Sequence, residues 1–256
     1  MGPLAACGYR VFALDLLGYG YSSKPAPSEE TPNTVYNFET WGEQLADFCS
    51  QVVGGPAFLV SNSVGGIAAL QCAVAAPSCC RGVVLMNVSL RGLHITKQMP
   101  FMRPLVATFQ RTLRTSALGK ALFGNIAQAS TVRAVLREAY GDKTAVTDEL
   151  VEKILQPGMQ PGATAVFLDF ISYSSGPLAE ELLPRVAAPV LTIWGEADPW
   201  EEVGKARLLY TPEAVPGVVE AFIALEGVGH CPQDEAPQLV NPLVADFVAR
   251  AVARSM

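Results

Sequence analysis

The chain has 256 residues, of which half are hydrophobic and 16% are charged, and its formal net charge at pH 7 is −6. This length is typical of one domain, or of one domain with an inserted segment, and it supplies enough apolar side chains for a large core. The acidic balance argues against nucleic acid as a partner. No apolar run approaches the roughly 20 residues of a membrane-spanning helix, which predicts a soluble protein.

The first predicted strand covers residues 9–14, and it leads into a loop marked by Gly18 and Gly20. Residues 38–53 carry apolar side chains at helical spacing, with Asn37 as the N-cap. A Gly-Gly-Pro sequence ends this helix, and an apolar strand over residues 57–61 follows. The chain therefore begins with a strand–helix–strand pattern.

Ser63 stands between the strand 57–61 and an Ala-rich helix over residues 67–76. A hydroxyl between a strand and a helix fits a nucleophile elbow, a sharp turn whose small neighbours let the two backbones approach closely. Gly65 fits the second small position of such a turn, while Ser61 stands where glycine is usual. Taken alone, this segment fits a Ser/Gly-rich loop equally well.

Strands and helices alternate up to a strand over residues 82–87, which predicts a parallel sheet with crossover helices. Residues 90–183 then show only helical patterns, and we interpret them as a helical cap inserted into a core formed by residues 1–89 and 184–256. Within the cap, helices are expected over residues 131–140, 147–155 and 164–173. In the second part of the core we expect strands over residues 189–194 and 219–225, a short helix over 203–210 and a closing helix over 237–253.

The charge distribution is uneven. No carboxylate occurs between Asp47 and Glu138, whereas residues 88–137 hold eight basic side chains, namely Arg91, Lys97, Arg103, Arg111, Arg114, Lys120, Arg133 and Arg137. This stretch is either a solvated face of the cap or a surface that attracts an anionic membrane or substrate. In the second case its apolar side would be Met99, Phe101, Met102, Leu105 and Phe109.

The six cysteines form no C-x-x-C pair and have no partnering histidine cluster. The sequence therefore indicates neither a metal site nor a disulfide framework, and no cofactor is expected. Most of these cysteines are expected to be buried small hydrophobic residues in a reducing compartment.

Ser63, Asp198 and His230 each follow the carboxyl end of a predicted parallel strand, and open α/β sheets collect their chemistry at that edge. In this chain order a serine can act as nucleophile, a histidine as its base and an aspartate as the group that orients the imidazole. Individually, Asp198 fits a turn before proline and His230 fits an ordinary loop, so the joint occurrence carries the hypothesis. The other histidine, His94, follows no strand end, and Asn87 carries no charge that would orient an imidazolium.

Four motifs resemble the α/β-hydrolase superfamily, namely Asp15-x-x-Gly18-x-Gly20-x-Ser22, Asn62-Ser63-Val64-Gly65-Gly66, Trp194-Gly195-x-x-Asp198-Pro199-Trp200 and Gly229-His230. Their forms are similar to plant and algal plastid hydrolases, the branch of pheophytinases and chlorophyll dephytylases. The resemblance implies the α/β-hydrolase fold, a mostly parallel sheet flanked by helices with an inserted helical cap. It also implies Ser63 as nucleophile, Asp198 as acid, His230 as base and the Val64 backbone N–H as an oxyanion donor.

The same resemblance implies hydrolysis of a carboxylic ester of a hydrophobic substrate, such as a phytyl or other long-chain ester. It places the protein in the chloroplast, and without it the cytoplasm is the expected location. The substrate pocket is expected to be lined by Asn62, Asn87, Phe101, Met102 and Trp200.

One departure from the family concerns the start of the chain. In the family, earlier strands and a His-Gly-type loop precede the strand predicted at residues 9–14, and that loop supplies the second oxyanion N–H. Loss of one such donor typically costs about 10²–10³ in rate, so we expect this chain to be a fragment of a longer protein. The missing loop leaves open a non-catalytic scaffold on the same fold.

Two enzymatic alternatives differ at the elbow. Asn62 before the nucleophile also resembles carbon–carbon hydrolases of aromatic ring-cleavage products, which use the same triad. Epoxide hydrolases and dehalogenases are disfavoured, because they carry aspartate where Ser63 stands.

Overall fold

The computed structural model describes residues 1–28 and 30–254. Its four strands form one parallel sheet in the order β1-β2-β3-β4, with β1 Ala57–Asn62, β2 Cys80–Met86, β3 Val190–Gly195 and β4 Val219–Leu225. The core also holds α1 Gly2–Ala6, α2 Phe38–Phe48, α3 Val64–Ala75, α10 Val203–Arg207, α11 Pro232–Glu235 and α12 Pro237–Arg254. A π-helical turn (Cys49–Val53) extends α2, and 3₁₀ turns cover Pro77–Cys79 and Leu183–Arg185.

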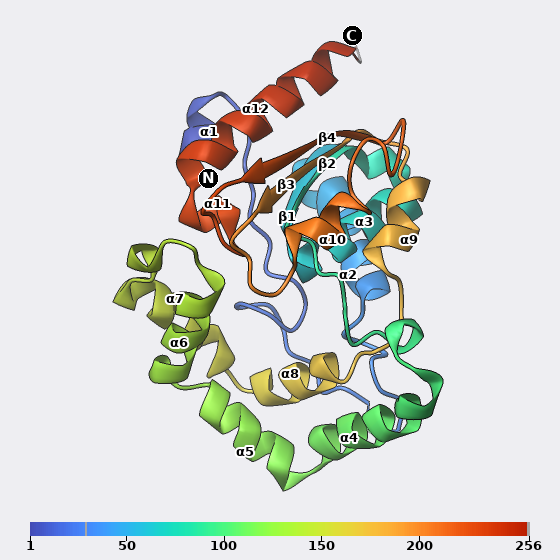
Figure 1. The fold of residues 1–256 in the computed structure, drawn as a ribbon, viewed down its shortest axis with the longest axis vertical. Helices are drawn as coiled ribbons and strands as arrows, with labels where there is room; N and C mark the ends of the chain where they lie inside the picture. The colour runs from blue at the N-terminus through green and yellow to red at the C-terminus, as the bar shows by residue number, and fades with distance from the viewer. Residues whose placement is uncertain (29, 255–256) are drawn as a thin grey trace.

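Helices cover both faces of the sheet, as an apolar parallel sheet requires. Successive residues of β2 point to opposite faces: Val83 and Leu85 belong to the core cluster with α2 and α3, whereas Val84 and Met86 pack with α12. Figure 1 shows α2 and α3 on one side of the strands and α12 on the other. The α/β architecture predicted from the alternating pattern is confirmed.

The strand predicted over residues 9–14 is wrong. These residues run without ladder pairing, and Phe12 remains 43% exposed while it packs edge-to-face on Phe48 at a centroid distance of 5.6 Å. Strand character requires a neighbouring strand to complete the hydrogen bonds. Here β1 is the terminal strand of the sheet, and its Val60 is 45% exposed.

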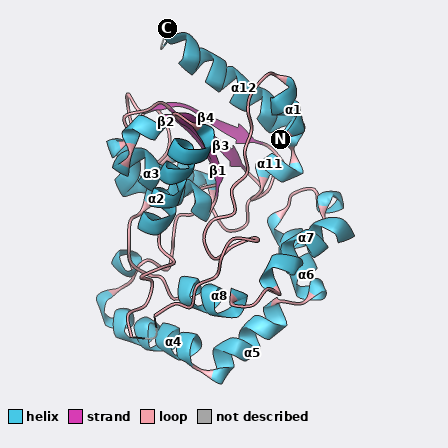
Figure 2. Cartoon of the chain, turned by 180° about the vertical axis from the view of Figure 1, so that it is seen from behind, coloured by secondary structure: helices cyan, strands magenta, loops and turns pink. Residues whose placement is uncertain are grey.

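Helices and loops alone connect β2 to β3 among the described residues (Figure 2). They are α4 Arg103–Thr115, α5 Ala117–Ile126, α6 Ala129–Ala139, α7 Asp148–Gly158, α8 Ala163–Ile171 and α9 Ala179–Leu182, with 3₁₀ turns at Ile95–Lys97, Pro100–Met102 and Lys143–Ala145. The helices predicted at 131–140, 147–155 and 164–173 correspond to α6, α7 and α8. The N-cap Thr147 explains where α7 begins, because its side chain accepts from the Leu150 N–H.

The two connections between the core and these helices are fastened to each other. Ile95 N donates to Ser174 O at 2.8 Å, and His94 Nε2 lies 2.9 Å from Gly176 O. The Arg91 guanidinium donates to the backbone carbonyl of Tyr173 at 2.7 Å and also lies 4.7 Å from the centre of that ring. These contacts join residues 91–95 to residues 173–176, and we call this junction the neck. Both ring nitrogens of His94 have a partner, since Nδ1 contacts Thr96.

Candidate active site

The carboxyl ends of the four strands meet at one edge of the sheet. Ser63 directly follows β1, Asn87 directly follows β2, Asp198 lies in the turn after β3 and His230 lies in the loop after β4. Because the strands are parallel, all four positions share this edge. The topology thus collects residues that are up to 168 positions apart in the chain, as the hydrogen bond between Asn62 and His230 shows.

Ser63 forms a sharp turn between β1 and α3, with φ 54° and ψ −126°. A positive φ at a residue other than glycine stores strain, which persists only where surrounding contacts hold it. Here the Ser63 N–H donates to Met86 O at 3.0 Å, and the Gly66 N–H donates to Ser63 O at 3.0 Å. The turn therefore presents the hydroxyl in a fixed backbone setting between strand and helix.

The close approach that demands a small residue falls on Gly66. A Cβ at Gly66 would lie 2.7 Å from Val88 Cγ2, whereas a Cβ at Gly65 would meet nothing within 4 Å. The steric demand for glycine therefore falls on Gly66, and the described contacts place no such demand on Gly65, which occupies the second small position of the motif. Ser61 is accommodated by donating its hydroxyl to Val84 O at 3.0 Å.

Asp198 and His230 are joined by a hydrogen bond of 2.7 Å between Oδ2 and Nδ1, and both residues are buried. The second carboxylate oxygen, Oδ1, accepts from the N–H groups of Trp200 at 2.9 Å and Glu201 at 3.1 Å. Burial by itself raises the pKa of Asp198. The hydrogen bond and charge of His230, with the bonds from Trp200 and Asn87, outweigh burial and hold this pKa below its ordinary value of 3.8. Asp198 is therefore ionised at neutral pH and holds the Nδ1 side of the imidazole.

Asn87 does not line a pocket, contrary to expectation. It is fully buried, and its polar atoms are satisfied there: its amide Nδ2 donates to Asp198 Oδ2 at 2.7 Å and its Oδ1 accepts from the Gly195 N–H at 2.9 Å. The oxygen that receives this bond is the one that faces His230. Asn87 is therefore a positioning residue for the carboxylate, with backbone φ 39° at the end of β2.

Asn62 and Trp200 lie beside the histidine. Asn62 Nδ2 donates to the carbonyls of His230 at 2.9 Å and Met86 at 3.0 Å, which ties the Ser63 turn to the histidine loop. The Trp200 ring meets the His230 ring edge-on at a centroid distance of 4.9 Å, and 45% of Trp200 is exposed. Both residues border the site, and their place in a substrate pocket stays a prediction.

Phe101 and Met102 lie in the 3₁₀ turn before α4, and no hydrogen bond or ring contact of the described residues links them to Ser63 or His230. Phe101 is 70% exposed. Its role as a pocket residue therefore has no support in this conformation, because the side chain faces solvent.

The helical segment reaches the site through the end of α6. The His230 N–H donates to Ala139 O at 2.8 Å, and Trp200 Nε1 donates to Glu138 Oε1 at 3.1 Å. A Cβ at Gly229 would lie 2.2 Å from the same Ala139 carbonyl oxygen. The histidine loop and α6 thus touch backbone to backbone, which requires glycine at position 229.

The Val64 backbone N–H is a further polar group at this edge. Val64 is the first residue of α3, so its N–H has no acceptor within the helix and points from the positive end of the helix dipole. Among the described residues, no hydrogen bond joins Ser63 Oγ to His230. Such bonds are often long in ligand-free sites and shorten when substrate binds.

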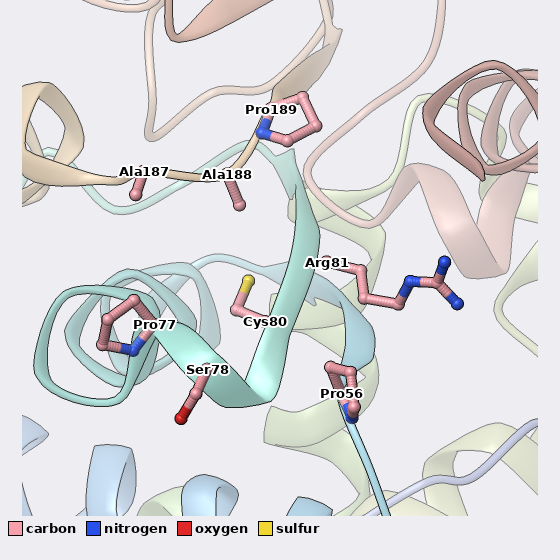
Figure 3. A pocket seen from close by; sticks show the side chains of 8 residues that line it. All are labelled: Pro56, Pro77, Ser78, Cys80, Arg81, Ala187, Ala188 and Pro189. Carbon is pink, nitrogen blue, oxygen red and sulfur yellow. The ribbon is translucent and has the colours of Figure 1, made fainter. Parts of the chain in front are cut away.

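A surface hollow lies at the opposite edge of the sheet. It has a volume of about 350 Å³ and is bordered by residues before and at the start of the strands, including Pro56, Cys80, Arg81 and Pro189 (Figure 3). None of the site residues lines it. This hollow therefore has no part in the candidate site.

Two further carboxylates each fasten a loop by hydrogen bonds to backbone N–H groups. Asp15 braces the early loop, because its Oδ2 accepts from the Tyr21 N–H at 2.8 Å. Glu201 was missed: its Oε2 accepts from the Leu90 N–H at 3.0 Å, which fastens the Asp198 turn to the chain after β2. Burial raises the pKa of Glu201 above its ordinary value. The only available signal was its position directly after the Asp198-Pro-Trp motif.

Two curated hydrolases are among the proteins whose sequences are similar to this chain. Pheophytinase from the chloroplast of Arabidopsis thaliana is 24% identical over 288 residues, covering 94% of this chain and 56% of that protein, so the chain spans little more than half the length of this relative. The 2-hydroxymuconate semialdehyde hydrolase of Pseudomonas sp. strain CF600 is 29% identical over 160 residues, covering 62% of this chain and 47% of that protein.

The fold is shared with solved hydrolase structures. The structure of the epoxide hydrolase CorEH without ligand superimposes with a TM-score of 0.74 at 19% identity, covering 97% of this chain and 84% of that one. The sequence profile described as the alpha/beta hydrolase family matches residues 1–243, nearly the whole chain. The protein therefore belongs to the alpha/beta hydrolase family.

Proposed function

We propose that this protein is a serine hydrolase that cleaves a carboxylic ester of a hydrophobic substrate, with Ser63, Asp198 and His230 as its catalytic triad. The observation that carries the proposal is the buried 2.7 Å hydrogen bond between Asp198 and His230, at the sheet edge where the strained Ser63 turn lies. A hydroxyl is a poor nucleophile at neutral pH unless a base removes its proton. An imidazole held by an ionised carboxylate is such a base.

In the proposed reaction, Ser63 Oγ attacks the ester carbonyl while His230 Nε2 takes the hydroxyl proton. The Val64 N–H donates to the oxyanion of the tetrahedral intermediate. Collapse of this intermediate breaks the bond to the alcohol, which leaves with the proton from His230. Water then attacks the acyl-enzyme while His230 takes its proton. The bond between the acyl carbon and Ser63 Oγ breaks, His230 returns the proton to Oγ, and the acid is released.

We further propose that residues 90–183 act as the cap above this site and contribute to substrate choice. The contacts of α6 with His230 and Trp200 support this arrangement, because they bring the helical segment to the catalytic edge. The chloroplast pheophytinase relative supports a long-chain substrate such as a phytyl ester, and a plastid location. The 2-hydroxymuconate semialdehyde hydrolase relative and Asn62 before Ser63 support a second candidate, hydrolysis of a carbon–carbon bond.

A fluorophosphonate probe tests the nucleophile directly. The wild type should be labelled and Ser63→Ala should not, while Ser78→Ala, an exposed serine at the opposite edge of the sheet, should be labelled like the wild type. Equal labelling of Ser63→Ala would refute Ser63 as nucleophile, and no labelling of any form would favour a non-catalytic scaffold. Turnover of phytyl or other long-chain esters against vinylogous diketones then separates the ester hydrolase from the carbon–carbon hydrolase.

A further inference from the structure

An apolar surface on the outer side of the helical segment has no partner within the described chain. Its members, called here the apolar rim, are Met99, Phe101, Leu105, Phe109 and Leu118, which are 60%, 70%, 62%, 59% and 62% exposed. Single exposed apolar residues are common, but a group of large ones in neighbouring elements indicates an interaction surface.

The rim faces away from the rest of the protein. Leu105 and Phe109 are four residues apart in α4 and therefore share one helix face. Gln110 and Arg114, also four residues apart, form a different face that is packed, because Gln110 is buried and Arg114 pairs with Asp169 of α8 at 3.5 Å. Leu113, one turn after Phe109, is buried at the end of the helix. Figures 1 and 2 show α8 between α4 and the sheet, so α4 lies on the outer side of the helical segment.

Several basic residues of the stretch 88–137 are paired with carboxylates, so fewer of them carry an unbalanced charge than the sequence indicates. Three of the eight basic residues of this stretch form ion pairs with carboxylates from elsewhere, namely Lys97 with Glu180, Arg114 with Asp169 and Arg133 with Asp148. Arg91 belongs to the neck. Arg111 of α4 and Lys120 of α5 are exposed, and the described residues show no ion pair for either. Both cations belong to the helices that carry Leu105, Phe109 and Leu118, Arg111 to α4 and Lys120 to α5.

We propose that the apolar rim docks onto an anionic lipid surface, with its apolar side chains in the headgroup region and Arg111 and Lys120 beside the lipid phosphates. Apolar residues flanked by cations on a surface helix form an interfacial membrane-binding pattern. The alternative occupant is a second copy of the chain, which the oligomeric states of the wild type and of the variant below test. No helix of the described residues is long and apolar enough to cross a bilayer, so the proposed contact is peripheral.

Vesicle co-sedimentation tests this proposal, using phosphatidylcholine alone and phosphatidylcholine mixed with phosphatidylglycerol. The wild type should bind the mixed vesicles more tightly, and binding should weaken as salt is added. The triple variant Phe101→Ser, Leu105→Ser, Phe109→Ser should bind more than about tenfold more weakly. Replacing Arg111 and Lys120 by Gln should cost about fivefold per cation and reduce the salt dependence.

Leu208→Ser is the matched control. Leu208 is also an exposed leucine, at 77%, but it follows α10 beside the sheet and lies outside the helical segment that carries the rim. This variant should bind vesicles like the wild type, and so should Ser63→Ala, since the proposal does not depend on the nucleophile. Circular dichroism verifies that the triple variant is folded. Absent binding to the mixed vesicles, or equal binding by the folded triple variant, would overturn the proposal. A wild-type dimer that the triple variant converts to a monomer would instead identify the rim as a contact between copies.

Discussion

Asn87→Asp is the substitution whose effect follows most directly from the structure. It leaves the side-chain shape unchanged but replaces the amide nitrogen, 2.7 Å from Asp198 Oδ2, by a carboxyl oxygen. The remaining oxygen can still accept from the Gly195 N–H. The variant therefore places two buried carboxyl groups in contact while it preserves the packing.

The magnitude follows from two competing costs. Two unit charges 2.7 Å apart repel by about 6 kcal/mol at an effective dielectric constant of 20. Binding one proton instead costs about 1.4 kcal/mol per pH unit above the ordinary aspartate pKa of 3.8, or about 4 kcal/mol at pH 7. The second cost is smaller, so the folded variant holds a proton that the unfolded chain releases. Its free energy of unfolding should match the wild type near pH 4 and fall by about 1.4 kcal/mol per pH unit towards pH 7.

Urea unfolding of wild type and Asn87→Asp across this pH range measures the difference. Asn125→Asp provides the control, because Asn125 is exposed on α5 and a new carboxylate there meets no second one in its hydrogen bonds. Its difference from the wild type should not vary with pH. A pH-independent loss of stability in Asn87→Asp would refute the reasoning, because it would show that packing and not charge dominates at this position.

Two further substitutions test neighbouring features. Gly195→Ala should destabilise the fold by about 1–3 kcal/mol or more, because its Cβ would lie 2.0 Å from Gly229 O, whereas Gly204→Ala would approach only a flexible Glu202 side chain at 3.4 Å; similar melting temperatures for the two variants would contradict this. Burial raises the pKa of Glu201 above its ordinary 4.5, so the wild type loses stability as pH rises from that value through the raised pKa. Glu201→Gln lacks this loss, and its melting temperature relative to the wild type should be higher at about pH 7.5 than at about pH 4; a constant difference would show that Glu201 keeps an ordinary pKa.

The sheet was predictable because its strands are short, nearly continuous apolar runs. The strand predicted at 219–225 matches β4, and the one predicted at 82–87 differs from β2 only at its ends. Residues 9–14 have a similar composition but form no strand. An apolar composition shows that a segment can pack in a core. Whether it forms a strand also depends on a neighbouring strand with which its backbone can pair.

The site was predictable to a different extent. The chain order of Ser63, Asp198 and His230 relative to strand ends suffices to place them at one edge, because parallel strands share a direction. The role of Asn87 was not predictable, since its partners Asp198 and Gly195 lie 111 and 108 residues away. A buried amide that serves a carboxylate and one that lines a pocket look the same in a sequence.

The neck has a consequence for how this architecture can diversify. The hydrogen bond of 2.8 Å between Ile95 N and Ser174 O joins the beginning of the helical segment to its end. A chain that leaves and returns at one point can be shortened, lengthened or exchanged there without stretching the strands on either side, since closing a loop costs little more as it grows. The helical segment between these two points can therefore vary in length and sequence while the sheet and the residues at its carboxyl edge stay the same.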